Sequence, residues 1–248
     1  MIDAFHALRL LKSHPLIDKI GYIGWSQGGV GPILSHFPHV TEFINGNRFK
    51  FDAAVSIYPY CGFTFPDNSL TGTPLLMITG QEDMLTPEQA CRNLYSKFYA
   101  SGGKINHLSL EDAHHGFGNP FLYFGLTIDR LPSLIVNNDA CTLTISNDGR
   151  IITLTKKDVS TSEMGTQLLN NCSVRGVKVK YNSKATQKAE EIRGPNINVP
   201  EKALEGFLRS NQIDKKEISD DEIFELASDS GAKECISCLL YTSDAADE

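Results

Sequence analysis

The chain has 248 residues, of which 41% are hydrophobic, and its formal net charge at pH 7 is −7. This length and composition suit one α/β domain, or one domain with an appendage. No apolar run reaches the roughly 18 residues of a membrane-spanning helix, and no basic face indicates a nucleic-acid partner. Residues 201–248 hold 13 acidic and 5 basic side chains, a balance typical of a solvated surface.

The first predicted elements are a helix, a strand and a second helix. Residues 2–12 predict an amphipathic helix, and residues 19–24 (KIGYIG) predict a short buried strand. Residues 30–37 (VGPILSHF) can form the next helix. The apolar side chains that recur at helical spacing in the first segment are Ala4, Phe5, Leu8 and Leu11.

The glycine-rich segment Gly24-Trp25-Ser26-Gln27-Gly28-Gly29 lies between that strand and the second helix. In this setting the pattern G-x-S-x-G is typical of a nucleophile elbow, a sharp strained turn that points a serine hydroxyl away from the sheet. Strand and helix pack closely there, so small residues are expected two positions before and two positions after Ser26. The turn also places the backbone N–H of Gln27 where an oxyanion would form.

A serine nucleophile needs a base, and the base needs a carboxylate that orients it. In proteins with this elbow, the carboxylate and the histidine follow the serine in that order. The apolar run 73–80 (TPLLMITG) predicts a strand that leads into Glu82 and Asp83, at the sheet edge where ligands bind. Asp83 is the preferred candidate and Glu82 the alternative. The competing interpretation is that Asp83 serves only as a turn or helix-cap residue.

The strand predicted at 105–110 (INHLSL) is followed by the candidate bases, His114 and His115. The alternative interpretations of this pair are a surface loop and part of a metal site. The sequence has no zinc-binding motif, so we predict neither a metal nor a cofactor. The other histidines, which we expect at the surface or in packing, are His6, His14, His36, His39 and His107.

Three motifs, GWSQGG, TPLLMITGQEDMLTP and DAHHGF, together resemble the dienelactone hydrolase family of α/β-hydrolases. The resemblance covers roughly residues 1–130, with a weaker match at 177–189. It implies that Ser26 is the nucleophile, Asp83 the acid, and His115 rather than His114 the base. The hydrolases that name the family use a cysteine at the elbow. The serine here therefore implies a broader ester-hydrolysing relative.

The same resemblance implies a partial fold. Complete α/β-hydrolases place several strands and a helix before the elbow, whereas 25 residues precede Ser26 here. We expect an α/β fold, a parallel sheet flanked by helices, in a fragment that lacks the N-terminal strands and the loop with the second oxyanion donor. We assign residues 1–130 to this truncated catalytic core and expect impaired activity. A genuinely minimal hydrolase is the alternative.

The sequence changes character after residue 130. Polar and apolar residues alternate on both sides of Asn147-Asp148-Gly149, which predicts a β-hairpin. Its alternative roles are a lid or wall over the pocket, a decoration, and a subunit contact. Residues 184–193 predict a polar helix, and the preceding YNSKA resembles the segment before the closing helix in relatives. We assign residues 131–195 to this β-hairpin insertion and closing helix.

The remaining residues divide into two predicted segments. Residues 196–237 are expected to form an acidic helical extension, because Pro200-Glu201 can begin a helix and Ser219-Asp220-Asp221-Glu222 is a capping-box pattern. The acidic residues do not have the spacing of a calcium loop. Residues 238–248 resemble the conceptual translation of a sequencing adapter, and we exclude them from the fold.

The cysteines carry a prediction about the compartment. Cys141 and Cys172 flank the hairpin, and a disulfide between them is predicted to tie the insertion. Such a bond would favour an extracytoplasmic location. Cys61 and Cys91 lie in the core region and are expected to be buried thiols. The sequence otherwise indicates neither a compartment nor an oligomeric state.

The function predicted from these residues is a serine hydrolase of small carboxylic esters or lactones, acting through an acyl-enzyme intermediate. Trp25, Tyr58, Tyr60 and Phe63 are the candidates to line the pocket, with core packing as their alternative role. Two other functions stay open: an oligopeptidase-like serine peptidase, which shares the order of the triad, and a non-catalytic remnant or scaffold of the fold.

Overall fold

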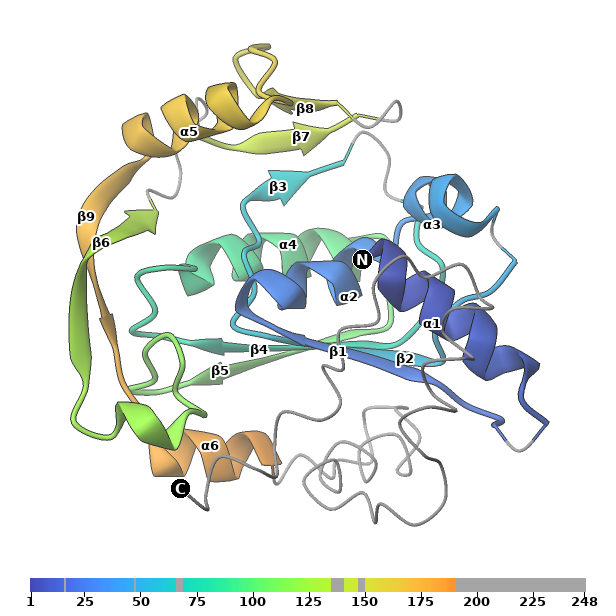
Figure 1. The fold of residues 1–248 in the computed structure, drawn as a ribbon, viewed down its shortest axis with the longest axis horizontal. Coiled ribbons are helices and arrows are strands. Elements are labelled where there is room, and N and C mark those ends of the chain that lie inside the picture. Colours follow the sequence, from blue (N-terminus) through green and yellow to red (C-terminus); the bar gives the residue numbers. More distant parts are fainter. Residues whose placement is uncertain (16, 47, 66–68, 135–140, 147–149, 191–248) are drawn as a thin grey trace, which may run out of the picture.

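The computed structural model describes residues 1–190, except residues 16, 47, 66–68, 135–140 and 147–149. A parallel sheet with helices on both faces lies at its centre (Figure 1). Its four strands stand in the order β1 (Gly21–Trp25), β2 (Ala53–Ile57), β4 (Leu75–Gly80) and β5 (Ile105–Leu110). All three pairings are parallel. The predicted α/β fold class, a parallel sheet flanked by helices, is confirmed.

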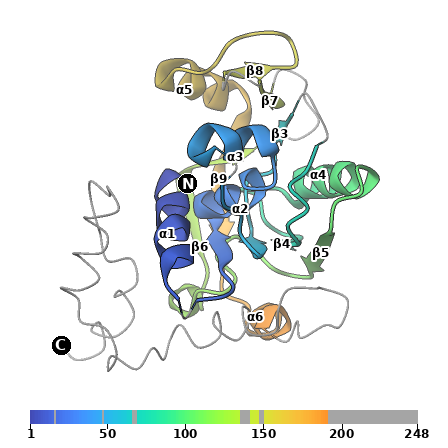
Figure 2. The ribbon, with the colours of Figure 1, turned by 90° about the vertical axis from the view of Figure 1, so that its right-hand side faces the viewer.

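The helices cover the sheet unequally. Figures 1 and 2 show α6 on one face and the other helices that flank the sheet on the opposite face. The two expected helices near the N-terminus are present, whereas α3 and α4 were not predicted. The helices on the more crowded face of the sheet are α1 (Ile2–Ser13), α2 (Val30–Leu34), α3 (Pro38–Asn45) and α4 (Glu88–Ala100). The helix on the other face, α6, spans Ser183–Glu190.

Strand β4 shows why the central strands are mainly apolar. Every one of its residues is buried. Leu75 and Met77 pack in the cluster that includes Leu94 of α4, whereas Leu76 packs in the cluster that includes Ala185 of α6. Because helices cover both faces, the strand has no solvent side, and its sequence is a continuous apolar run rather than an alternating one.

The second half of the described chain extends from one end of the sheet. Strands β6 (Leu126–Leu134) and β9 (Ser173–Val179) form an antiparallel ribbon. Beyond the ribbon lies the predicted hairpin, β7 (Leu143–Ile145) and β8 (Ile151–Thr153), followed by α5 (Ser162–Asn171). Figure 1 shows this part placed over α4. The hairpin is present as predicted, whereas the ribbon and α5 were not predicted.

One contact joins the insertion to the core, and a second contact closes the insertion on itself. Strand β3 (Phe63–Thr64), just after β2, pairs with β7 in parallel. Cys141 and Cys172, the pair expected to tie the insertion, form a disulfide.

A second disulfide corrects the sequence interpretation. Cys61 and Cys91 are bonded to each other, so the expectation of two buried thiols was wrong. The residues lie 30 positions apart, but the topology brings the segment after β2 beside the first turn of α4, with the two Cα atoms 4.9 Å apart. That separation falls within the range of about 4.4–6.8 Å that a disulfide requires.

The predicted acidic extension (196–237) and the adapter-like segment (238–248) lie outside the described residues. The predicted helix at 184–193 is described only as far as residue 190, where α6 ends. Within the part of the chain that is described, no helix has the length and apolar character needed to cross a membrane.

The disulfide of the insertion gives a first prediction. We expect the variant Cys141→Ser/Cys172→Ser to lose about 3–4 kcal/mol of unfolding free energy, because a cross-link that closes a loop of this length restricts the unfolded chain. Urea unfolding of the oxidised proteins measures this loss. Either single substitution should cost about as much as the double variant, and an unchanged midpoint in all three would contradict the prediction.

Candidate active site

Ser26 lies at a strained turn between β1 and the short helix η1 (Ser26–Gly29), which leads into α2. Its φ is +52°, in the left-handed region that a non-glycine residue seldom adopts. Such strain persists only where the surrounding structure enforces it, and it is common at functional sites. The geometry is that of the predicted elbow.

Glycine is needed at only one of the two flanking positions that were expected to be small. A Cβ at Gly24 would collide with the carbonyl group of Gly28, whereas a Cβ at Gly28 would have no heavy atom within 4 Å. The expectation was therefore wrong for Gly28. It is the Gly28 backbone, and not its missing side chain, that closes the turn against the strand.

The structure brings Ser26, His115 and Asp83 together. Ser26 Oγ lies 2.8 Å from His115 Nε2, and His115 Nδ1 lies 2.8 Å from Asp83 Oδ2. The three residues follow the C-terminal ends of β1, β5 and β4, which meet at one edge of the parallel sheet. A hydroxyl, an imidazole and a carboxylate thus form one continuous series of hydrogen bonds.

The two alternative candidates lie elsewhere. The ring Nδ1 of His114 is 3.0 Å from the backbone carbonyl of Glu82, and the Glu82 side chain is exposed. His115 and Asp83, by contrast, are 8% and 4% exposed. Burial therefore also separates the pair that meets Ser26 from the pair that does not.

Asp83 is both the partner of His115 and a turn residue, so its two interpretations do not exclude each other. Its Oδ1 accepts the backbone N–H groups of Leu85 and Thr86, each at 2.9 Å. Its Oδ2 faces His115 and lies 2.8 Å from the Thr86 hydroxyl. The turn that follows β4 therefore fixes the direction of the carboxylate.

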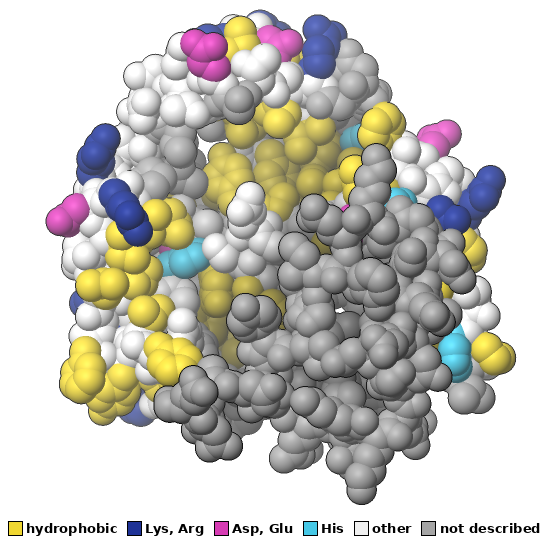
Figure 3. All heavy atoms as spheres, viewed as in Figure 1, with side chains coloured by type: hydrophobic (Ala, Val, Ile, Leu, Met, Phe, Trp, Pro, Cys, Tyr) yellow, Lys and Arg dark blue, Asp and Glu magenta, His cyan; other side chains and the backbone are white. Residues whose placement is uncertain are grey.

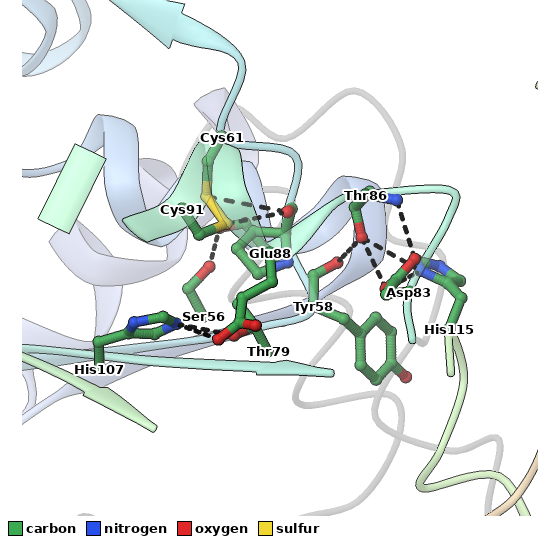
Figure 4. Close-up of a disulfide and its surroundings, with 12 residues drawn as sticks. Ser56, Tyr58, Cys61, Thr79, Asp83, Thr86, Glu88, Cys91, His107 and His115 are labelled. Atoms are coloured by element: carbon green, nitrogen blue, oxygen red, sulfur yellow. Dashed lines mark hydrogen bonds and ion pairs between the residues drawn. A yellow bond between two sulfur atoms is a disulfide. The ribbon is translucent and has the colours of Figure 1, made fainter. Parts of the chain in front are cut away.

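Thr86 belongs to the hydrogen-bonded group around Asp83 and His115, and the sequence analysis did not identify it. Its Oγ1 lies 2.8 Å from Asp83 Oδ2, 3.1 Å from the Tyr58 carbonyl and 3.2 Å from His115 Nδ1 (Figure 4). A hydroxyl has one proton, so Thr86 donates to either the carboxylate or the carbonyl and can accept from the imidazole. Its position three residues after Asp83 is the only local signal for this role.

Tyr58 forms an aromatic wall against the base. Its ring centroid lies 4.8 Å from that of His115 and 5.2 Å from that of Phe117, and both pairs are edge-to-face. Burial, with a further contribution from the negative charge of Asp83, raises the pKa of Tyr58 to about 12. The phenol therefore stays neutral at ordinary pH, and Tyr58 contacts the base.

The four residues predicted to line the pocket lie in different places. Trp25 is 44% exposed beside the elbow, and Tyr58 packs on His115. Tyr60 and Phe63 line a cavity of about 430 Å³. Among the described residues that line this cavity, none belongs to the group of Ser26, Asp83 and His115.

The segment before α6 holds the loop that carries His115. Asn182 donates its backbone N–H to the Phe117 carbonyl at 2.9 Å and its side-chain amide to the Asp112 carbonyl at 3.1 Å. Its Oδ1 accepts the N–H of Ala185 at 3.0 Å, which caps the helix. The YNSKA segment thus connects α6 to the loop of the base.

Gln27 is the second residue of η1. Backbone N–H groups in the first turn of a helix have no acceptor within that helix, so this N–H is suited to donate to a ligand oxygen beside Ser26.

Two of the other histidines have packing roles, one buried (His36) and one partly buried (His107). His36 contacts the carbonyls of Pro32 and Thr73, and His107 contacts the Thr79 hydroxyl. Burial lowers the pKa of both imidazoles. A search of the described residues finds no group of three or more His, Cys, Asp or Glu side chains that could hold a metal ion.

No protein-family model matches the sequence, and no curated protein matches it. Solved structures match parts of it. Acyl-protein thioesterase 2 of Zea mays is 16% identical, with 46% of this chain and 57% of that chain covered and a TM-score of 0.34. A putative α/β-hydrolase of Agrobacterium tumefaciens is 24% identical, with 46% and 49% covered and a TM-score of 0.35.

Esterase 2 of Thermogutta terrifontis, phosphorylated by paraoxon, is 19% identical, with 47% of this chain and 54% of that chain covered and a TM-score of 0.38. The chain spans about half the length of these solved structures. The similarities are distant, and the fold assignment rests on the sheet order and the elbow.

The elbow gives a prediction with a matched control. Gly24→Ala should lower the free energy of unfolding by about 1–3 kcal/mol, because the new methyl group meets backbone that cannot move aside. Gly28→Ala should change it by less than about 1 kcal/mol, because the methyl group enters open space. Urea unfolding compares the two variants. Equal losses would contradict the packing described at this turn.

Thr86 gives a second prediction. Thr86→Val keeps the shape of the side chain but removes the hydroxyl, so we expect a loss of about 1–2 kcal/mol of unfolding free energy from the buried polar groups left without a partner. Thr86→Ser keeps the hydroxyl and should be the more stable of the two. If the valine variant equalled or exceeded the serine variant in stability, the hydrogen bonds of Thr86 would not contribute.

Proposed function

We propose that this chain is a serine hydrolase of carboxylic esters, with Ser26 as nucleophile, His115 as general base and acid, and Asp83 as the carboxylate that orients the base. The observation that carries the proposal is the series of two 2.8 Å contacts from Ser26 through His115 to Asp83, at a turn where Ser26 has a φ of +52°. The resemblance to dienelactone hydrolases, with serine in place of cysteine, supports an ester or lactone as the substrate.

The first half of the reaction acylates the serine. Ser26 Oγ attacks the carbonyl carbon of the ester while its proton passes to His115 Nε2. Asp83 accepts a hydrogen bond from Nδ1–H, which keeps Nε2 available for the proton and stabilises the imidazolium that forms. The N–H of Gln27 donates to the negative oxygen of the tetrahedral intermediate. The intermediate then collapses, and His115 returns the proton to the departing alcohol.

The second half repeats these steps with water. His115 takes a proton from a water molecule, whose oxygen attacks the acyl carbon. The second tetrahedral intermediate expels Ser26 Oγ, which regains its proton from His115, and the carboxylic acid is released. One oxyanion donor is worth on the order of 3 kcal/mol in such reactions, about a hundredfold in rate, and we expect the N–H of Gln27 to contribute on that scale.

Covalent labelling tests this proposal. We expect a fluorophosphonate probe to add once to the wild-type chain, as seen by intact mass, and not to add to Ser26→Ala. Asp83→Asn should slow the addition strongly, on the order of 10⁴-fold, because the imidazole then adopts the wrong tautomer. Glu82→Gln makes the same carboxylate-to-amide exchange on the exposed neighbouring side chain, and as the control it should leave the rate of addition unchanged.

The outcomes separate the three candidate functions. An adduct on wild type that Ser26→Ala lacks supports a serine hydrolase, and the rates with aryl esters and short peptides then distinguish an esterase from an oligopeptidase-like enzyme. A folded wild-type chain without an adduct would refute the proposal and favour the non-catalytic scaffold. Circular dichroism and urea unfolding establish that each protein is folded.

A further inference from the structure

The cavity of about 430 Å³ lies between the core and the insertion. Figure 3 shows a hollow lined by hydrophobic side chains, placed between the part of the molecule that contains α5, β7 and β8 and the part below it. The core contributes residues of β3 and one face of α4, and the insertion contributes residues of β7, β8 and α5. The apolar side chains from these elements include Phe63, Ala90, Leu94, Leu143, Ile151 and Leu168.

The size and lining of the cavity suit an apolar organic group. Small-molecule sites commonly measure about 300–1,000 Å³ and are mostly apolar, with few polar groups. On α4, Ala90 and Leu94 line the cavity, together with Asn93 and Lys97 at the matching helical spacing. Asn93 and Lys97 are exposed. The polar groups of this helix face therefore lie where the cavity meets solvent.

The disulfides make the cavity a preformed one. Cys61, Cys141 and Cys172 are among the lining residues, so both cross-links belong to its wall. One holds the segment after β2 against α4, and the other closes the insertion. A site whose walls are covalently held loses little conformational entropy when a ligand binds.

The cavity adjoins the loops that support the base. Pro87 lines it, and the preceding residue, Thr86, lies 3.2 Å from His115 Nδ1. Tyr60 also lines it, two residues after Tyr58, whose ring packs on His115. Consecutive Cα atoms are about 3.8 Å apart, so the wall of the cavity begins within one or two residues of groups in contact with the imidazole.

We infer that this cavity binds the acyl chain of the ester, and that the substrates are esters of apolar carboxylic acids with chains of several carbons. The inference rests on the proposed function. The acyl group stays attached to Ser26 after the alcohol has left, so a preformed apolar site near the loops of His115 suits it better than the departing alcohol. Burial of each methylene group favours binding, and specificity for longer chains follows.

Gly165 of α5 offers a way to fill the cavity from the insertion. It lines the cavity, and a Cβ placed on it would have the Val159 carbonyl oxygen, at 3.9 Å, as its one heavy-atom neighbour within 4 Å among the described residues. Gly165→Phe should therefore place a ring in the cavity. Gln167→Phe puts the same side chain on an exposed position of the same helix and serves as the control.

The kinetic test compares para-nitrophenyl acetate, butyrate and octanoate. In wild type we expect kcat/KM to rise with the length of the acyl chain. In Gly165→Phe the ratio of kcat/KM for octanoate to that for acetate should fall by about tenfold or more, since burial of only two methylene groups is worth that factor. In Gln167→Phe this ratio should stay as in wild type. An equal ratio in both variants would overturn the inference.

A binding test separates failure of this inference from failure of the proposed function. Ser26→Ala, which has no nucleophile, should bind dansyl-labelled undecanoate with saturable fluorescence, and octanoate should displace it. Addition of Gly165→Phe should abolish binding, whereas addition of Gln167→Phe should not. Absence of saturable binding to Ser26→Ala would overturn the inference even if the esters are hydrolysed.

One result would remove the proposed function itself. If the fluorophosphonate forms no adduct with the folded wild type while the dansyl probe still binds in a way that Gly165→Phe abolishes, the cavity binds apolar chains but no acyl-enzyme forms. That pair of results would overturn the proposal that the apolar chain bound in the cavity is the acyl group of a substrate.

Discussion

The geometry of the site depends on the hydrogen bonds that Asp83 accepts. Two backbone N–H groups from the turn after β4 hold one carboxylate oxygen, and His115 and the Thr86 hydroxyl meet the other. A buried carboxylate is costly unless such partners surround it. The same contacts that make its burial tolerable also set the orientation of the imidazole, so the stability of the turn and the alignment of His115 toward Ser26 have one physical origin.

Local patterns in the sequence predicted the elements that build this site. The run of β5 predicted a strand, and the apolar run of β4 predicted a buried one, because helices cover both faces of the sheet at β4 and no alternation is needed. The elbow was evident from its glycines, and the order of Ser26, Asp83 and His115 followed from the order of the strands. What these patterns share is that each depends on residues close together in the chain.

The features that could not be predicted depend on residues far apart in the chain. Strand β9 has two buried residues, Val177 and Val179, so its apolar pattern is too weak to identify its pairing with β6. The Cys61–Cys91 disulfide requires the topology that places α4 beside the end of β2. Thr86 looks like an ordinary turn residue until His115, 29 positions later, is brought next to it.

The antiparallel ribbon has a consequence for how this part of the protein can change. Leu126 at the start of β6 pairs with Val179 at the end of β9, and the next residue, Lys180, donates its N–H to the His115 carbonyl at 3.4 Å. The insertion thus leaves and re-enters the core at a single anchored point. Additions, deletions or exchanges beyond the ribbon leave that anchor in place, so the region over α4 is free to diversify as a module while the base keeps its position.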